Sequence, residues 1–122
     1  MNAKNLLATS LLAFLAAACG GSKSTAPPGP TTTTLSCHQV ADGYCLAGTG
    51  TPTAAEIASF NADCNAPPAG VLGTGCPIAG RIGTCTLTAT ATGTAVFSFY
   101  PPFLLADAVT GCTALSGTWK AG

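Results

Sequence analysis

The sequence predicts a small, disulfide-rich α+β domain with a short antiparallel sheet of about three strands and two helices, in the order β-α-β-β-α. Two segments repeat apolar residues at helical spacing, and short runs alternate polar and apolar residues with period two. Six cysteines between positions 37 and 112 form an even set, which is typical of a disulfide framework. The chain has 122 residues, a length that suits one domain.

A short strand and then a helix are expected to open the domain. Residues 43–46 are a strand candidate between glycine-containing turns. Thr53 and Glu56 have the spacing of a capping box, in which each side chain bonds the other residue's backbone N–H at the start of a helix. Alternatively, Thr51 caps the helix and Pro52 takes its first position.

A β-hairpin is expected next. A Gly/Pro-rich loop over residues 65–80 leads to strand candidates at residues 81–88 and 95–100, which a turn near Gly93 separates. Side chains alternate between the two faces of a strand, so one face of the hairpin collects apolar residues. The residues expected to form half of the core are Cys85, Leu87, Phe97 and Phe99.

The second helix is expected over residues 104–115. Leu105, Val109 and Cys112 recur there at helical spacing and should share one buried face. Gly117 follows the last of these apolar residues and suits a helix C-cap.

An export signal is expected before the domain. One positive charge at Lys4 precedes residues 6–18, which hold only Leu, Ala, Thr, Ser and Phe. As a helix this run would be about 20 Å long, short of the roughly 20 residues that span a bilayer. Its length and flanks therefore favour a cleavable signal over a permanent transmembrane helix.

The end of this run resembles a bacterial lipobox, the site that signal peptidase II cleaves. Residues 15–19 read Leu-Ala-Ala-Ala-Cys, although Ala16 stands where leucine is commoner. The resemblance implies that Cys19 becomes the N-terminus and carries a diacylglycerol and an acyl chain such as palmitate, which together anchor a protein stably. Gly20, rather than Asp, resembles the outer-membrane sorting pattern of Gram-negative lipoproteins. The alternative is an ordinary secretory signal cleaved near Ala18.

These features divide the chain into three parts. Residues 1–18 are the expected signal peptide, residues 19–35 the lipidated N-terminus and a linker, and residues 36–122 the globular domain. The linker consists almost entirely of Gly, Ser, Pro and Thr, a composition that cannot bury a core and is typical of a disordered tether.

Lipidation of Cys19 leaves six cysteines for three disulfides. A faint internal repeat guides their pairing, because an aromatic-ended strand followed by a helix that ends in cysteine is expected twice, starting at Tyr44 and at Tyr100. The pairs that this repeat favours are Cys45–Cys64 and Cys85–Cys112, which leave Cys37–Cys76. The rival pairing joins Cys64 to Cys76 across the Gly/Pro loop.

The residues that could carry chemistry are few. Charged residues make up 7% of the chain and form no basic cluster, so nucleic-acid binding is not expected. His38 lies near Asp42 in the sequence, but it is expected to be solvent-exposed at the edge of the domain. The paired cysteines of structural zinc sites are absent from the sequence. We therefore expect no catalytic residue, no metal and no cofactor.

The aromatic side chains near the Pro-Pro pair and the C-terminus are the candidate binding surface. They are Tyr100, Phe103 and Trp119. Exposed apolar patches often mark interfaces, although packing against the core is the alternative for Tyr100 and Trp119.

A second resemblance rests on cysteine and glycine spacing. Residues 37–119 contain Tyr-Cys, Gly-x-Gly-Cys-Pro, Arg-Ile-Gly-Thr-Cys and Cys-x₄-Gly-Thr-Trp. This pattern is similar to uncharacterised small cysteine-rich lipoproteins of Gram-negative bacteria, and it implies no activity. The sequence thus predicts a lipid-anchored, non-enzymatic envelope protein, in the outer membrane, that binds an envelope protein or glycan. The alternatives are a structural or protective envelope protein without a ligand, and an inhibitor or toxin-like scaffold that presents the 65–80 loop.

Overall fold

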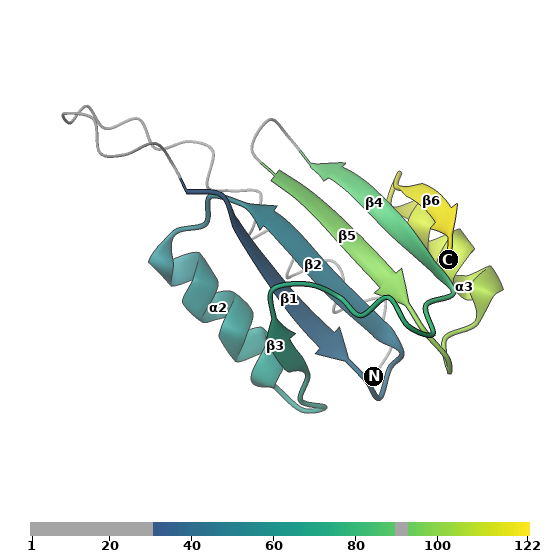
Figure 1. The fold of residues 1–122 in the computed structure, drawn as a ribbon, viewed down its shortest axis with the longest axis horizontal. Helices are drawn as coiled ribbons and strands as arrows, with labels where there is room; N and C mark the ends of the chain where they lie inside the picture. Colours follow the sequence, from purple (N-terminus) through teal and green to yellow (C-terminus); the bar gives the residue numbers. More distant parts are fainter. Residues whose placement is uncertain (1–30, 90–92) are drawn as a thin grey trace.

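A computed structural model describes residues 31–89 and 93–122 of the chain. They form a six-stranded antiparallel sheet with strand order β3-β1-β2-β5-β4-β6 and two helices (Figure 1). The elements in chain order are β1 (Thr33–Gln39), β2 (Tyr44–Gly50), α2 (Ala54–Asn65), β3 (Val71–Gly73), β4 (Gly83–Ala89), β5 (Gly93–Phe99), α3 (Leu105–Ala114) and β6 (Thr118–Ala121). The predicted sheet of about three strands and the order β-α-β-β-α are therefore wrong.

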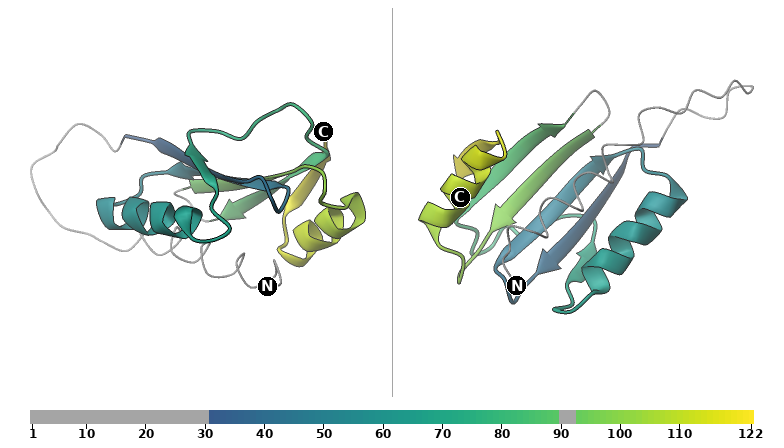
Figure 2. Two further views of the ribbon diagram at one scale, coloured as in Figure 1. Left: turned by 90° about the horizontal axis from the view of Figure 1, so that it is seen from below. Right: turned by 180° about the vertical axis from the view of Figure 1, so that it is seen from behind.

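The sheet is covered differently on its two faces. Both helices lie on one face, and residues 74–82 cross the opposite face as a loop that joins β3 to β4 (Figure 2). We call residues 74–82 the crossing loop and the face beneath it the loop face. Each disulfide fastens one covering segment to the sheet: Cys37–Cys64 holds α2, Cys45–Cys76 holds the crossing loop, and Cys85–Cys112 holds α3.

The fold consists of two similar halves. Each half is a hairpin, then a helix, then a short strand that pairs antiparallel with the first strand of its own hairpin. The halves meet where β2 pairs with β5. Counted from either edge of the sheet, each half therefore contributes its third, first and second strand in that order. In both halves a disulfide of sequence separation 27 joins the first strand to the helix. The structure thus contains a repeat, but not the expected one that starts at Tyr44 and Tyr100, because Cys37, and not Cys45, corresponds to Cys85.

Two apolar clusters lie between the sheet and the helices. The larger one lies under α3, and its buried members are Cys85, Leu87, Phe97, Phe99, Ala108 and Cys112. The smaller one lies under α2 and contains Cys37, Phe60 and Cys64. Leu46 on β2 packs against both clusters and joins them. The predicted pairing of the hairpin faces is correct, since Cys85 stands opposite Phe97 in the sheet.

Helix α2 begins as its capping box predicts. The Thr53 hydroxyl accepts from the Glu56 N–H at 3.3 Å, and the Glu56 carboxylate accepts from the Thr53 N–H at 2.6 Å. These bonds satisfy backbone donors that the first helical turn leaves free. The alternative start with Thr51 as the cap is therefore not the one adopted.

Three strands were not predicted, and each has a sequence that hides it. β1 begins at Thr33, inside the segment predicted as linker. It was missed because its polar residues resemble the Thr run in which it starts. Its buried positions include Ser36 and Gln39 as well as Cys37. β3 and β6 are edge strands of three and four residues, too short to show a period.

The disulfide pairing needs correction in two of its three bonds. The structure joins Cys37 to Cys64 and Cys45 to Cys76, whereas the sequence favoured Cys45–Cys64 and Cys37–Cys76. The cause is that β1 was not predicted. This strand contacts α2, and its Cys37 side chain lies on the face of the sheet that the helices cover. Cys45 follows on β2 with its side chain on the loop face, opposite His38 in the register. The expected pair Cys85–Cys112 is present.

The N-terminal predictions lie outside the described residues. These are the signal peptide over residues 1–18, lipidation at Cys19 and the linker up to residue 30. Within residues 31–89 and 93–122, no helix is long and apolar enough to cross a membrane.

Candidate functional site

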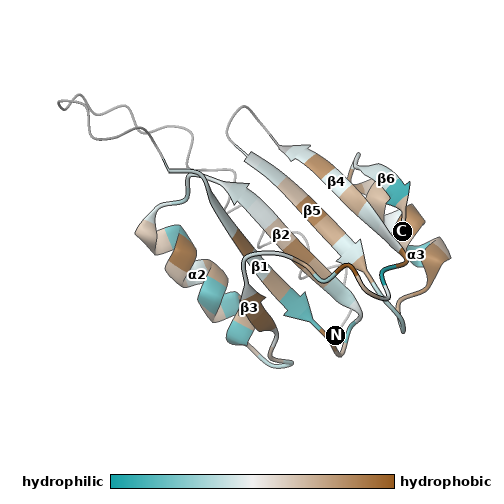
Figure 3. Cartoon of the chain, in the orientation of Figure 1, coloured by the Kyte–Doolittle hydropathy of each residue, from teal (hydrophilic) through white to brown (hydrophobic). Residues whose placement is uncertain are grey.

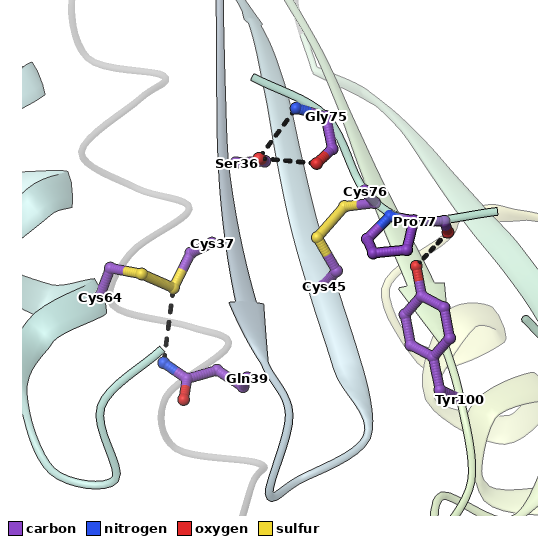
Figure 4. The surroundings of a disulfide bond; sticks show 9 residues. All are labelled: Ser36, Cys37, Gln39, Cys45, Cys64, Gly75, Cys76, Pro77 and Tyr100. Carbon is purple, nitrogen blue, oxygen red and sulfur yellow. Dashed lines mark hydrogen bonds between the residues drawn. A yellow bond between two sulfur atoms is a disulfide. The ribbon is translucent and has the colours of Figure 1, made fainter. Parts of the chain in front are cut away.

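The crossing loop is attached to the sheet at its start by a serine. Ser36 on β1 is 1% exposed, and its hydroxyl donates to the Gly75 carbonyl at 3.0 Å while accepting from the Gly75 N–H at 2.9 Å (Figure 4). One side chain thus satisfies both backbone groups of a loop residue. A buried hydroxyl needs such partners, because an unpaired buried polar group is costly.

The next two loop residues are held by a covalent bond and a hydrogen bond. Cys76 forms a disulfide with Cys45, which is completely buried on β2. The Tyr100 hydroxyl donates to the Pro77 carbonyl (Figure 4). The Tyr100 ring lies 5.0 Å from the His38 ring, centroid to centroid, so His38 supports the tyrosine from β1.

The end of the loop is fixed by a turn and by the sheet. The Arg81 N–H donates to the Ile78 carbonyl at 3.4 Å, which closes a four-residue turn. Gly80 has a φ of +73° there, a conformation that favours glycine. The Ile82 N–H then donates to the Phe99 carbonyl at 2.8 Å and leads the chain into β4.

Between these attachments the loop presents apolar side chains to solvent. Ile78 is 77% exposed, the highest value among the large apolar side chains of the described residues. Its neighbours Pro77 and Ala79 are also exposed, and residues 66–80 contain no charged side chain. The crossing loop accordingly carries an apolar segment over the face of the sheet (Figure 3).

A shallow hollow at one end of the sheet is the second candidate. It has a volume of about 280 Å³ and is lined by Ala41, Asp42, Pro102, Phe103, Leu104 and Asp107. This is at or below the lower end of the volumes of small-molecule pockets, about 300 Å³. Burial and, second, the negative charge of Asp42 raise the pKa of Tyr44 above 10.0. Asp42 and Asp107 make the lining of the hollow acidic, and its size suits a single side chain rather than a whole ligand.

The three predicted surface aromatics differ in their positions. Tyr100 is 6% exposed, because its ring packs against His38 and its hydroxyl reaches the crossing loop, so it is not a binding surface. Trp119 is half-buried on β6, with its ring 5.7 Å from that of Phe99. Phe103 is half-buried too, 4.9 Å from the same Phe99 ring, and it lines the hollow.

Sequence reasoning did not identify Ile78 or Ser36 as site residues. A usable signal exists for Ile78, which is a large aliphatic residue outside any periodic segment, placed between two cysteines in a loop of Gly, Ala and Pro. No sequence signal marks Ser36, because its role depends on a partner far along the chain.

The carboxylates lie at separate places in the fold, except that Asp42 and Asp107 both line the hollow. Glu56 caps a helix, Asp107 lies in the first turn of α3, and Asp42 lies in the β1–β2 turn. Nowhere in residues 31–89 and 93–122 do three or more metal-ligating side chains gather into a possible metal site. No protein-family model, curated protein or solved structure matches the chain.

Proposed function

We propose that this protein is a lipid-anchored, non-enzymatic interaction module of a Gram-negative cell envelope, and that the crossing loop is its binding element. The observation that carries the proposal is the combination of three attachments and a closing turn with one exposed aliphatic side chain. Ser36, Cys45 and Tyr100 hold the loop from below, a turn closes its far end, and Ile78 points away from them into solvent.

The attachments exceed what connecting two strands requires. Surface loops are ordinarily the most mobile parts of a domain, and mobility raises the entropic cost of binding. The second half of the fold holds its helix with one disulfide and has no counterpart of Cys45–Cys76. The extra disulfide therefore serves the loop rather than the repeated architecture.

The envelope location is supported by the N-terminal sequence and by the cysteines. The lipobox-like ending at Cys19 implies a lipid anchor, and the six remaining cysteines all pair in the structure. Disulfides of this density are typical of small exported domains. Replacement of Cys19 by serine should abolish acyl labelling, and unchanged labelling would contradict the anchor.

The inhibitor scaffold is the second candidate, and it shares the same loop. A protease binds its substrate as an extended strand, whereas the Ile78 carbonyl is engaged in a turn with Arg81. The loop is thus better suited to insert a side chain into a partner than to imitate a substrate. The exposed Ile78 on a fixed loop favours a binding role over a structural protein without a ligand.

Site-specific photo-crosslinking in the native cells tests the proposal. A benzophenone amino acid is placed at Ala79 in the crossing loop and, as a matched control, at exposed Ala58 on α2, on the other face of the sheet. We expect a discrete adduct from position 79 and none from position 58. An absence of adducts at position 79, or the same adducts from both positions, would contradict a binding role of the loop.

A further inference from the structure

We infer that Ile78 is the anchor residue of the interface and that it enters a preformed aliphatic pocket on a folded protein partner. The inference rests on the proposed function and identifies the chemistry of the partner. Three properties of the loop carry it: three of its carbonyls are already hydrogen-bonded, its shape is fixed before binding, and Arg81 is its single charged residue.

Part of the loop backbone is already hydrogen-bonded before any partner covers it. The carbonyls of Gly75, Pro77 and Ile78 accept from Ser36, Tyr100 and Arg81, respectively. These donors approach from within the domain, so a partner need not supply replacements. Desolvation of unpaired polar groups is a main cost of burying an irregular loop, and at these three carbonyls that cost is absent.

The loop is also ordered before it meets a partner. The Cys45–Cys76 bond fixes the chain two residues before Ile78, and the turn closed by Arg81 fixes it after. Ile78 itself has a β-branched side chain, which has few rotamers to lose. Preorganised anchors of this kind bind mainly through the burial of one side chain in a fitting pocket.

A protein pocket fits these features better than a membrane surface. Within the described residues the only basic side chains are Arg81 and Lys120, too few to attract anionic lipid headgroups. One aliphatic side chain gives weak attachment to a bilayer, whereas the same side chain can dominate a protein interface when a pocket encloses it.

The test uses the photo-crosslinker at Ala79 and changes its neighbour. In that background Ile78→Ser should lower the yield of the protein adduct at least tenfold, because the apolar burial of the anchor is lost. Ile78→Val should retain most of the yield, since it keeps the branched shape. Leu115→Ser, which removes a half-exposed apolar side chain on the other side of the sheet, is the matched control and should leave the yield unchanged.

The outcomes separate the two proposals. An adduct at position 79 that survives Ile78→Ser would refute the anchor while leaving the loop a binding element. Adducts with lipid or glycan instead of protein would refute the protein partner. Because Ile78 is exposed, the melting temperature of each variant should match that of the parent, and this measurement shows that a lost adduct reflects lost contact rather than unfolding.

Discussion

Two glycines near the C-terminus should respond to the same substitution in opposite directions. Gly111 lies within α3, and a Cβ added there meets no atom within 4 Å. Gly111→Ala should therefore stabilise the fold by up to about 1 kcal/mol, the difference in helix propensity. Gly117 follows α3, and its Cβ would lie against Cys85 Sγ, 2.6 Å from Leu87 Cδ2 and 2.9 Å from Cys112 Sγ.

The second substitution has little room to relax. Two of the three contacted atoms are the sulfurs of one disulfide, which both the sheet and the helix hold in place. Overpacking of a buried site typically costs about 1–3 kcal/mol, and we expect Gly117→Ala near the upper end. The two variants should then differ by roughly 3–4 kcal/mol in free energy of unfolding.

Urea unfolding of the oxidised parent protein and both variants measures this difference. The midpoint should rise for Gly111→Ala and fall for Gly117→Ala, with similar m-values, since neither change alters the surface exposed on unfolding. If Gly117→Ala is as stable as the parent, the close packing of the chain against the Cys85–Cys112 bond is incorrect.

Three further predictions concern the α2 cap, the β1–β2 turn and the crossing loop. The Thr53 backbone N–H and, second, the Thr53 hydroxyl lower the pKa of Glu56 below 4.5. The stabilising effect of the Glu56 carboxylate is therefore present at neutral pH and lost as the pH falls through that lowered pKa. The urea midpoints of Glu56→Gln and of the parent protein should accordingly converge at low pH. Asp42→Asn should lower the pKa of Tyr44 in an NMR titration yet leave it above 10.0, because burial is the larger cause, and a fall to 10.0 would contradict this order. Ser36→Ala should cost about 0.5–1.5 kcal/mol in urea unfolding and speed hydrogen exchange of the loop amide it holds, whereas unchanged exchange would show that the bond is unimportant.

Local chemistry explains which parts of the fold the sequence predicts. The capping box, the helical spacing up to Cys64 and the alternation over residues 81–88 are each encoded within a few residues, and the structure confirms all three. β1 is different, because its polar residues are buried by partners far along the chain, such as the loop that Ser36 binds. Strands whose stability comes from pairing and cover carry little local signal.

The candidate site follows the same division. Residues 65–80 were predicted as a Gly/Pro-rich loop. One alternative function, the inhibitor or toxin-like scaffold, required this loop to be exposed. The side chains that fix it, Ser36 and Tyr100, belong to strands that approach only in the folded sheet. Tyr100 is part of the predicted binding surface, because the sequence does not reveal that a loop crosses above it.

The repeat in the fold explains both the disulfide error and the place of the site. Equal separations of 27 residues join the first strand to the helix in each half, so these two bonds belong to the shared architecture. The Cys45–Cys76 bond breaks the symmetry, because it fastens the crossing loop to the sheet. This loop connects the two halves and belongs to neither. The segment that joins the halves is held by a disulfide, a buried serine and a buried tyrosine, and it carries the exposed Ile78 at its centre. This combination is what favours the proposed binding role of the loop.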